Sequence, residues 1–483
     1  MPFGRLAVPA CVGAILLTGA CAGASGAPAA GSSEESAPGA SPVPEGRGGD
    51  VADDVNGDGF PDLLFLSSYT EDEDEDGLEG DMRLVVVHGS RNGPEPTTRA
   101  VFEAGVVGAG ASVGGGNRLR PGTADLDGDG YADIPVLTGF SPGSLGASVS
   151  TGRPGIVWGG PTGPDPQEEP GPVSVPGGSS GVPGSPVAAP TPGDFDGDGH
   201  ADLAVAVDSA TGADAAELVV LYGPFDREGE PGRTARRPVD PWIGGLVAAP
   251  AGPGGGPAPL LVRHGSDGEQ PANTLLVTGP GDPAGWDALE LLPGSLSAFG
   301  DFDGDGETDV AVGDDGTRND EPGHGTEPDE VDGRMNVYRG PFGTQAPEPL
   351  PEPLPVPLTA TEPSISYHQR TVAACDLDGD GADTLAVGLA GHGVDLLDED
   401  GGEFSAAGAP PLVRSGPEDG PRGADSPAAR TAEAFACADH DADGSDELVL
   451  AYDPGVVRSA PVRWWVTDGD ADEGAFDSGD FGG

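Results

Sequence analysis

The stretch Asp301-Phe302-Asp303-Gly304-Asp305-Gly306-Glu307-Thr308-Asp309 runs directly into the apolar segment Val310-Ala311-Val312-Gly313. Nearly the same nine residues, again followed by an apolar run, begin at Asp54, Asp125, Asp194, Asp376 and Asp439. Similar stretches that recur along a chain are typical of repeat architectures, in which one small unit is copied around a scaffold. The sequence therefore predicts six copies of one acidic loop, each leading into a strand.

The spacing of the carboxylates predicts what these loops bind. Acids stand at the first, third, fifth and ninth positions of most copies. A glycine at the sixth position allows a sharp reversal of the backbone. Calcium takes roughly six to eight oxygen ligands, which these side chains and the backbone carbonyl of the seventh residue can supply. A transition metal would favour His or Cys ligands. We therefore expect Ca²⁺ at about five or six sites.

The expected metal ligands come from all six loops, and the seventh residue of a loop contributes its backbone carbonyl. In chain order they are Asp54, Asn56, Asp58, Phe60, Asp62, Asp125, Asp127, Asp129, Tyr131, Asp133, Asp194, Asp196, Asp198, His200, Asp202, Asp301, Asp303, Asp305, Glu307, Asp309, Asp376, Asp378, Asp380, Asp439, Asp441, Asp443 and Glu447. The loop that begins at Asp376 has Asp383 at the eighth position and Thr384 at the ninth. We expect this loop to bind calcium most weakly or not at all.

Two other interpretations of the loops are disfavoured. An EF-hand would place a glutamate at the twelfth position, between two helices. The twelfth residues are all apolar: Phe65, Val136, Val205, Val312, Val387 and Leu450. Acidic Asp-Gly runs can also be simple Asx turns. Six copies in the same phase, each before an apolar run of strand character, argue against that interpretation.

The fold class follows from what comes after each loop. A first strand is followed by a glycine-rich or acidic stretch and then by a second apolar run that ends in glycine, such as Glu217–Gly223. Radial repetition of such small antiparallel sheets is a β-propeller. The first aspartates are 71, 69, 107, 75 and 63 residues apart. The gap of 107 contains two apolar runs, 258–264 and 273–280, without an acidic loop. We therefore predict an all-β, seven-bladed propeller over residues 50–470 with a degenerate blade four, and an acidic glycine-rich tail over 471–483.

At this point the sequence resembles the FG-GAP or VCBS-type repeat family, the repeat of the integrin alpha-subunit head and of many exported bacterial proteins. The resemblance covers residues 50 to about 470 and rests on the acidic loops, on Phe299-Gly300, and on Gly223-Pro224 and Gly340-Pro341. It implies calcium loops that join the first two strands of a blade on one face, with ligands bound on the opposite face. The family's Gly-Ala-Pro is absent, so the resemblance extends to the fold and the loop rather than to integrin ligand specificity.

The N-terminal residues resemble a bacterial lipoprotein signal. Arg5 precedes an apolar run over residues 6–17, and Thr18-Gly19-Ala20-Cys21 follows it. Residues 1–20 are the expected signal peptide, Cys21 the expected lipidation site, and 21–49 a flexible Ala/Gly/Ser/Pro tether. Two acyl chains would hold the protein at the outer face of the cell membrane. Because Thr18 stands where leucine is usual, plain secretion is the alternative.

The formal net charge of −60 limits the possible partners. Nucleic acid is excluded, since binding to phosphates depends on Lys and Arg. All 22 basic residues are arginine. The insertions over 70–81 and 314–333 are expected on the face opposite the calcium loops, as solvated loops or as a surface for a basic partner. We expect an extracellular protein or glycan as the partner, membrane contact only through the lipid anchor, and a monomer.

Two cysteines outside the signal precede the loops at Asp376 and Asp439. They are Cys375 and Cys437, one and two residues ahead of their loops. An exported protein permits a disulfide between them. Alternation along a strand points these two offsets to opposite faces, which favours two separately buried thiols. Both alternatives stay open at the level of the sequence.

No catalytic motif survives inspection. Two Gly-x-Ser-x-Gly matches occur at 139–143 and 177–181, but Pro142 has no N–H for an oxyanion hole and no strand precedes the second match. His200 and His440 lie inside acidic loops, where we expect their side chains to point to solvent. We therefore expect no enzyme and predict a cell-surface adhesion or ligand-binding module. The alternatives are a lectin-like propeller and an extracellular hydrolase or lyase with a site built from loops.

Overall fold

The structure is a computed structural model of the chain. It describes residues 41–49, 51–67, 83–102, 120–138, 153–175, 190–208, 216–239, 243–250, 255–265, 270–316, 331, 333–344, 349–350, 354–355, 370–406, 409–417, 430–453 and 461–481. All of them belong to one compact unit, Ala37–Gly483. The expected signal peptide, Cys21, the insertion over 70–81, most of the insertion over 314–333 and both Gly-x-Ser-x-Gly stretches lie outside the described residues.

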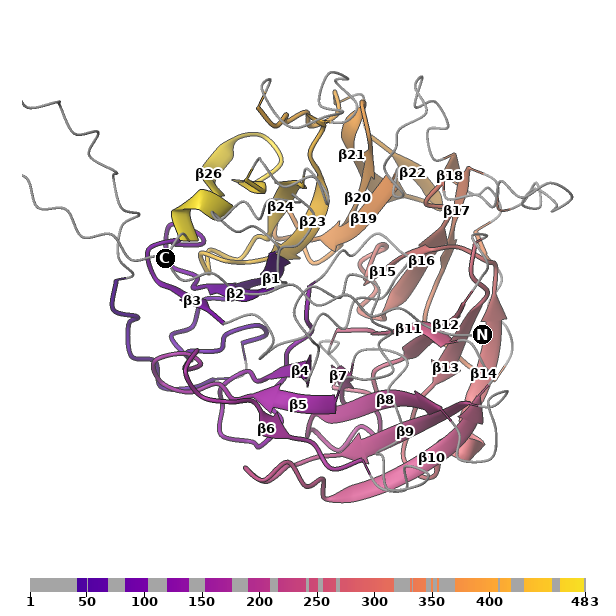
Figure 1. The fold of residues 1–483 in the computed structure, drawn as a ribbon. Coiled ribbons are helices and arrows are strands. Elements are labelled where there is room, and N and C mark those ends of the chain that lie inside the picture. Colours follow the sequence, from indigo (N-terminus) through magenta and orange to yellow (C-terminus); the bar gives the residue numbers. More distant parts are fainter. Residues whose placement is uncertain are drawn as a thin grey trace, which may run out of the picture. The chain divides into compact units, whose positions relative to one another are not determined.

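The strands pair with their neighbours in sequence to form seven small antiparallel sheets (Figure 1). Five sheets have four strands and two have three in the described part of the chain. The described residues contain no α-helix, only short 3-10 turns, and none of their helices has the length and apolar character needed to cross a bilayer. The predicted seven-bladed, all-β propeller is therefore confirmed. Blades are numbered here in chain order.

Each blade takes its strands from one continuous stretch of chain. Blade one has β1 (Leu63–Ser67), β2 (Arg83–Val87) and β3 (Arg99–Val101), and blade two has β4 (Ile134–Thr138), β5 (Arg153–Val157) and β6 (Gly171–Pro172). Blade three has β7 (Thr191–Gly193), β8 (Asp202–Asp208), β9 (Ala216–Tyr222) and β10 (Arg233–Val239), and blade four has β11 (Ile243–Ala248), β12 (Leu260–His264), β13 (Asn273–Val277), η3 (Pro283–Gly285) and β14 (Asp287–Leu291). Blade five has β15 (Leu296–Gly300), β16 (Asp309–Gly313), β17 (Arg334–Tyr338) and β18 (Leu354–Pro355); blade six has β19 (Arg370–Cys375), β20 (Thr384–Leu389), β21 (Gly393–Asp400) and β22 (Glu403–Ser405); and blade seven has β23 (Glu433–Ala438), β24 (Glu447–Tyr452), β25 (Arg463–Thr467), β26 (Asp472–Asp477) and η5 (Ser478–Phe481).

The core lies between neighbouring blades. Along β1, Leu64 packs with Ile134 of blade two, whereas Phe65 packs with Trp464 of blade seven. Successive side chains of a strand point to opposite faces, so a sheet with a neighbour on both sides needs apolar residues at every position. This is why the strands read as continuous apolar runs rather than as alternating patterns.

Blade seven contradicts the predicted acidic tail over 471–483. β26 pairs with β25 along its length, and both Phe476 and Phe481 are buried. The ring of Trp464 stacks on Phe476 with centroids 5.3 Å apart, and Phe65 lies 4.3 Å from Trp464. Phe476 of β26 and Phe481 of η5 thus bury this otherwise polar C-terminal segment against blade one. Blade seven thus has four strands of its own and meets blade one through aromatic packing.

The segment 46–49, expected to be part of the tether, lies on the acidic loops of blades one and two. Gly46 N donates to Pro161 O (2.9 Å), Arg47 N donates to Gly57 O (2.7 Å), and Gly49 N donates to Gly130 O (2.7 Å). Glycine permits this close approach, because a Cβ on Gly46 would lie 2.0 Å from the carbonyl oxygen of Asn56. The ordered part of the chain therefore begins before residue 50.

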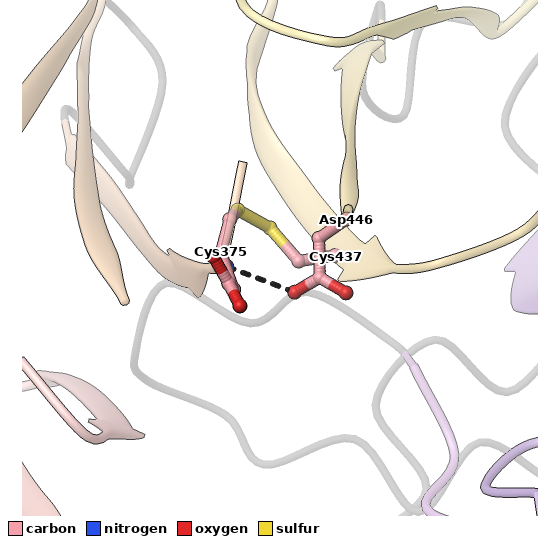
Figure 2. The surroundings of a disulfide bond; sticks show 4 residues. Cys375, Cys437 and Asp446 are labelled. Atoms are coloured by element: carbon pink, nitrogen blue, oxygen red, sulfur yellow. Dashed lines mark hydrogen bonds between the residues drawn. A yellow bond between two sulfur atoms is a disulfide. The ribbon is translucent and has the colours of Figure 1, made fainter. Parts of the chain in front are cut away.

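Cys375 and Cys437 form a disulfide between β19 and β23, with their Cα atoms 5.5 Å apart (Figure 2). The two side chains do lie on opposite faces of their own sheets, as alternation predicts. All blades have the same orientation in the ring, so two neighbouring blades meet through opposite faces. One face of blade six therefore packs against the other face of blade seven. The alternation that favoured separate thiols is therefore what brings the two sulfurs together.

We predict that Gly46→Ala releases segment 46–49 from the loops, because the added Cβ has no room. Trypsin should then cut after the exposed Arg47 at least about tenfold faster, since a loss of ~1.4 kcal/mol of docking free energy raises the open population tenfold. N-terminal sequencing would detect a product that begins at Gly48. The control is Gly49→Ala, whose Cβ would meet no atom within 4 Å. Equal cleavage of the two variants would show that the segment is not docked.

Candidate metal centres

The first aspartate of each acidic loop holds the loop by accepting backbone N–H groups. In blade two, Asp125 Oδ1 accepts from Gly128 N (2.8 Å) and Oδ2 accepts from Gly130 N (2.8 Å). The other five loops repeat the bond from the sixth residue. The fourth and sixth residues all have φ between 58° and 102°. Glycine adopts such values without strain, and only Ala442 departs from glycine at these positions.

Carboxylates converge in five of the six loops. In each cluster, one oxygen per residue lies within 4.8 Å of the others. The clusters are Asp125, Asp127 and Asp133; Asp194, Asp196 and Asp202; Asp301, Asp303 and Asp309; Asp376, Asp378 and Asp380; and Asp439, Asp441, Asp443 and Glu447. The fifth-position residues Asp129, Asp198 and Asp305 lie outside the clusters of their loops. Five loops therefore present an all-oxygen donor set that could hold a metal ion.

Blade one has no such cluster among its described residues. Its third position is Asn56, whose amide donates to Asp58 (3.0 Å). Its ninth residue, Asp62, is fully buried beside His88, with the His88 Nδ1 atom 3.2 Å from Asp62 Oδ1. The sequence pattern did not indicate a histidine as the neighbour of this carboxylate.

The ninth carboxylate has a structural role that the sequence analysis missed. In blade two, Asp133 Oδ2 accepts from Leu126 N (3.0 Å) and Oδ1 accepts from Gly159 N (2.8 Å). The same pair of bonds, from the second loop residue and from the glycine that ends the second apolar run, occurs in blades one, three and five. The ninth acid thus joins the loop to the strand that follows.

The strand-ending glycine is required by space. A Cβ on Gly159 would lie 2.5 Å from the carbonyl oxygen of Ala132, the eighth loop residue. The equivalent distances for Gly89, Gly223 and Gly340 are 2.4, 2.3 and 2.5 Å. The glycine-terminated runs in the sequence therefore mark the partners of the ninth carboxylates.

We predict that Gly159→Ala lowers the free energy of unfolding by about 1–3 kcal/mol, because it separates the backbone N–H from a buried carboxylate. The next residue provides the control, since a Cβ on Gly160 would meet no atom within 4 Å. Gly160→Ala should stay within about 0.5 kcal/mol of the wild type. Denaturant unfolding of both variants measures the difference, and equal stabilities would contradict the proposed role of the glycine.

The eighth-position aspartates of blades six and seven lie outside the carboxylate clusters and join neighbouring blades. Asp383 accepts from Asp301 N (2.7 Å), and Asp446 accepts from Asp376 N (3.0 Å). Each therefore connects its own loop to the first residue of the loop in the preceding blade. Figure 2 shows Asp446 beside the disulfide that joins the same two blades. In blade six the ninth residue, Thr384, donates its hydroxyl to Asp398 (2.7 Å) instead of supplying a carboxylate.

His440 does not point to solvent, contrary to the prediction from the sequence. Its side chain is fully buried, and Nδ1 lies 2.8 Å from Pro61 O of blade one. Burial lowers the pKa of His440 to about 4, so the ring is neutral at pH 7. His440 is the second residue of its loop. This position packs against the neighbouring blade, so its side chain is buried even though it is polar. His200, at a seventh position, is exposed as predicted.

Burial also raises the pKa values of the ninth acids. It brings the pKa of Asp133, Asp202 and Asp309 to about 7 and that of Glu447 to about 8. The backbone N–H bonds act in the opposite direction but are smaller effects. Without a cation, the ionised form of these groups is therefore disfavoured in the folded protein.

These shifts predict the pH dependence of the metal-free protein. A carboxyl group whose pKa is higher in the folded than in the unfolded state stabilises the fold as the pH falls toward the unfolded pKa. In a chelator, the melting temperature should therefore rise as the pH falls from about 8 to about 5. The lowered pKa of His440 destabilises the fold as the pH falls below about 6.5. This is one group against the four acids Asp133, Asp202, Asp309 and Glu447, so the net effect of acidification is stabilising. Thermal melts at pH 8 and pH 5.5 measure this, and a lower value at pH 5.5 would contradict it.

Residues 187–222 match the FG-GAP repeat. The chain is a seven-bladed β-propeller that contains an FG-GAP repeat. The match covers the loop at Asp194 and the strands β8 and β9 of blade three, and every other blade except blade four repeats the same arrangement of loop and strand. A propeller of this repeat is in general a ligand-binding or adhesion module, and the repeat is typical of extracellular proteins. No curated protein matches the chain.

Among solved structures, three mutants of the Synechocystis apocarotenoid oxygenase are similar to the chain. They are 10–11% identical, cover 91% of this chain and 92% of the oxygenase, and have TM-scores of 0.43. These neighbours correct the expectation that the chain is not an enzyme, because they are enzymes, and the fold class gives no ground for excluding catalysis. At this TM-score the likeness carries no argument for oxygenase chemistry in this chain.

Proposed function

We propose that the chain is an exported, calcium-stabilised propeller that acts as a cell-surface adhesion or ligand-binding module. The observation that carries the proposal is the set of five carboxylate clusters, each on a loop of the same conformation. A donor set made only of oxygens suits a hard cation such as calcium, and it does not suit metals that favour nitrogen or sulfur.

Buried oxygen atoms in two of the clusters support a cation there. Asp196 Oδ1 and Asp303 Oδ1 are buried and have no hydrogen-bond partner in the described part of the chain. A buried carboxylate oxygen without a donor is costly unless a cation compensates it. Calcium would be held in each cluster by its acids, and it would supply the positive charge that keeps the buried ninth acids ionised.

The remaining parts of the proposal concern place and partner. The lipoprotein-like N-terminus supports anchoring through Cys21 at the outer face of the cell membrane, with a monomeric propeller beyond it. The acidic composition supports a protein or glycan partner rather than nucleic acid. By the family resemblance, the partner would bind on the face opposite the acidic loops. Arrays of glycans and surface proteins, probed with and without calcium, would identify the partner class.

We predict that chelation lowers the melting temperature by roughly 3–10 °C. Extracellular modules bind calcium at about 10⁻⁴–10⁻³ M, so at roughly 2 mM each site adds on the order of 0.7–1.8 kcal/mol. Four or five such sites add about 3–9 kcal/mol to the free energy of unfolding. Asp303→Asn combined with Asp305→Asn should remove about one site's share of the shift.

Magnesium should restore stability poorly in the same experiment, because it requires a smaller, octahedral shell. Thermal melts in excess chelator, in millimolar calcium and in millimolar magnesium provide the measurement. A melting temperature that is the same in chelator and in calcium would refute the calcium part of the proposal.

A further inference from the structure

Three arginines lie on third-position aspartates of the acidic loops. Arg233 Nη2 is 2.7 Å from Asp196 Oδ2 in blade three, and Arg339 Nη1 is 3.0 Å from Asp303 Oδ2 in blade five. In blade two, Arg227 bonds both Asp127 and Asp129. The whole chain has only 22 basic residues against 82 acidic ones, so this placement uses a scarce residue type.

Each of these guanidinium groups is held by a second contact. Arg233 lies 3.5 Å from the ring centroid of Tyr222, and Arg227 lies 4.8 Å from the ring of Trp158. Arg339 also bonds Glu399 of blade six (2.6 Å). Stacking on an aromatic face and bonding two carboxylates both restrict the long arginine side chain. The positive charges therefore have defined positions beside the loops.

In two of the three loops, the arginine pairs with only one oxygen of the third-position carboxylate. Asp196 and Asp303 each give Oδ2 to the guanidinium, whereas their buried Oδ1 atoms have no hydrogen-bond partner in the described part of the chain. The arginine therefore fixes one oxygen of the carboxylate and leaves the other to the cluster. The guanidinium and a bound metal ion would therefore both interact with the same carboxylate.

The loop of blade seven differs from these three. No arginine of the described chain pairs with its cluster acids Asp439, Asp441, Asp443 and Glu447. The side chain of another acid, Glu473, instead lies close enough to add negative charge beside Asp441 and Glu447. This loop therefore combines the largest cluster with no internal positive charge.

We propose that Arg227, Arg233 and Arg339 are internal counter-ions that grade the calcium affinities of the loops, an inference that rests on the calcium binding proposed above. Beside an empty loop, the guanidinium offsets the repulsion between carboxylates. Beside a loaded loop, the same charge repels the ion. An arginine therefore stabilises the empty loop more than the loaded one, which lowers the affinity. Blade seven, which has no such arginine and has four cluster acids against three in blade six, binds calcium most tightly.

The first test compares Arg233→Gln with Arg236→Gln in the full chain. Arg236 lies on the same strand but pairs with Glu217 (2.6 Å), away from the acidic loops. In chelator, Arg233→Gln should melt below Arg236→Gln. In a calorimetric calcium titration, it should show one site about two- to fivefold tighter than in the wild type, the range expected for partly exposed charges. An unchanged or weaker affinity, with equal melting in chelator, would overturn the proposal.

The second test locates the tightest site. Asp441→Asn in blade seven should remove the tightest step of the calcium titration, whereas Asp196→Asn in blade three should remove a weaker one. Loss of the tightest step with Asp196→Asn would overturn the grading. The wild type separates this inference from the function it rests on, because a wild type that binds no calcium refutes the calcium sites themselves. A wild type that binds calcium at sites insensitive to the arginines refutes only the grading.

Discussion

The buried carboxylate at the ninth position of the acidic loops is the constraint on which the blades depend. In blade two, Asp133 accepts one N–H from its own loop and one from Gly159, at the end of the second strand. It therefore fixes the loop, the hairpin and the edge at which neighbouring blades meet. The same burial that makes these bonds strong raises the pKa of the group to about 7. Each blade must therefore either place a positive charge near this buried carboxylate or replace the carboxylate with an uncharged group.

The seven blades use different solutions to that requirement. Blade one places His88 beside Asp62, and blades two, three and five add an arginine to an acidic cluster. Blade four has no acidic loop, and Thr278 donates its hydroxyl to Ala258 O (2.7 Å) where blades one, two, three and five use glycine and carboxylate. Blade six replaces the ninth acid with Thr384. The fold thus tolerates loss of the carboxylate wherever another group completes the junction.

Much of this architecture could be predicted from the sequence, because the loops and the strand runs repeat with one spacing. Three structural features that were predicted wrongly, and the disulfide that the sequence left open, all depend on a neighbouring blade. The disulfide depends on which faces of β19 and β23 meet, and the burial of His440 depends on Pro61, far away in the sequence. Segment 46–49 and β26 looked like linker and tail because they are polar and rich in glycine. Their order comes from contacts with other blades rather than from a local pattern.

Three contacts near the chain ends join neighbouring blades without involving an acidic cluster. The disulfide joins blade six, whose loop has no ninth acid, to blade seven. The stack of Phe65, Trp464 and Phe476 joins blade seven to blade one, which has Asn56 at a ligand position. Segment 46–49 then covers the loops of blades one and two. A covalent bond, aromatic packing and backbone hydrogen bonds are all independent of a metal ion. Blades six, seven, one and two are therefore joined in part by contacts that need no metal ion.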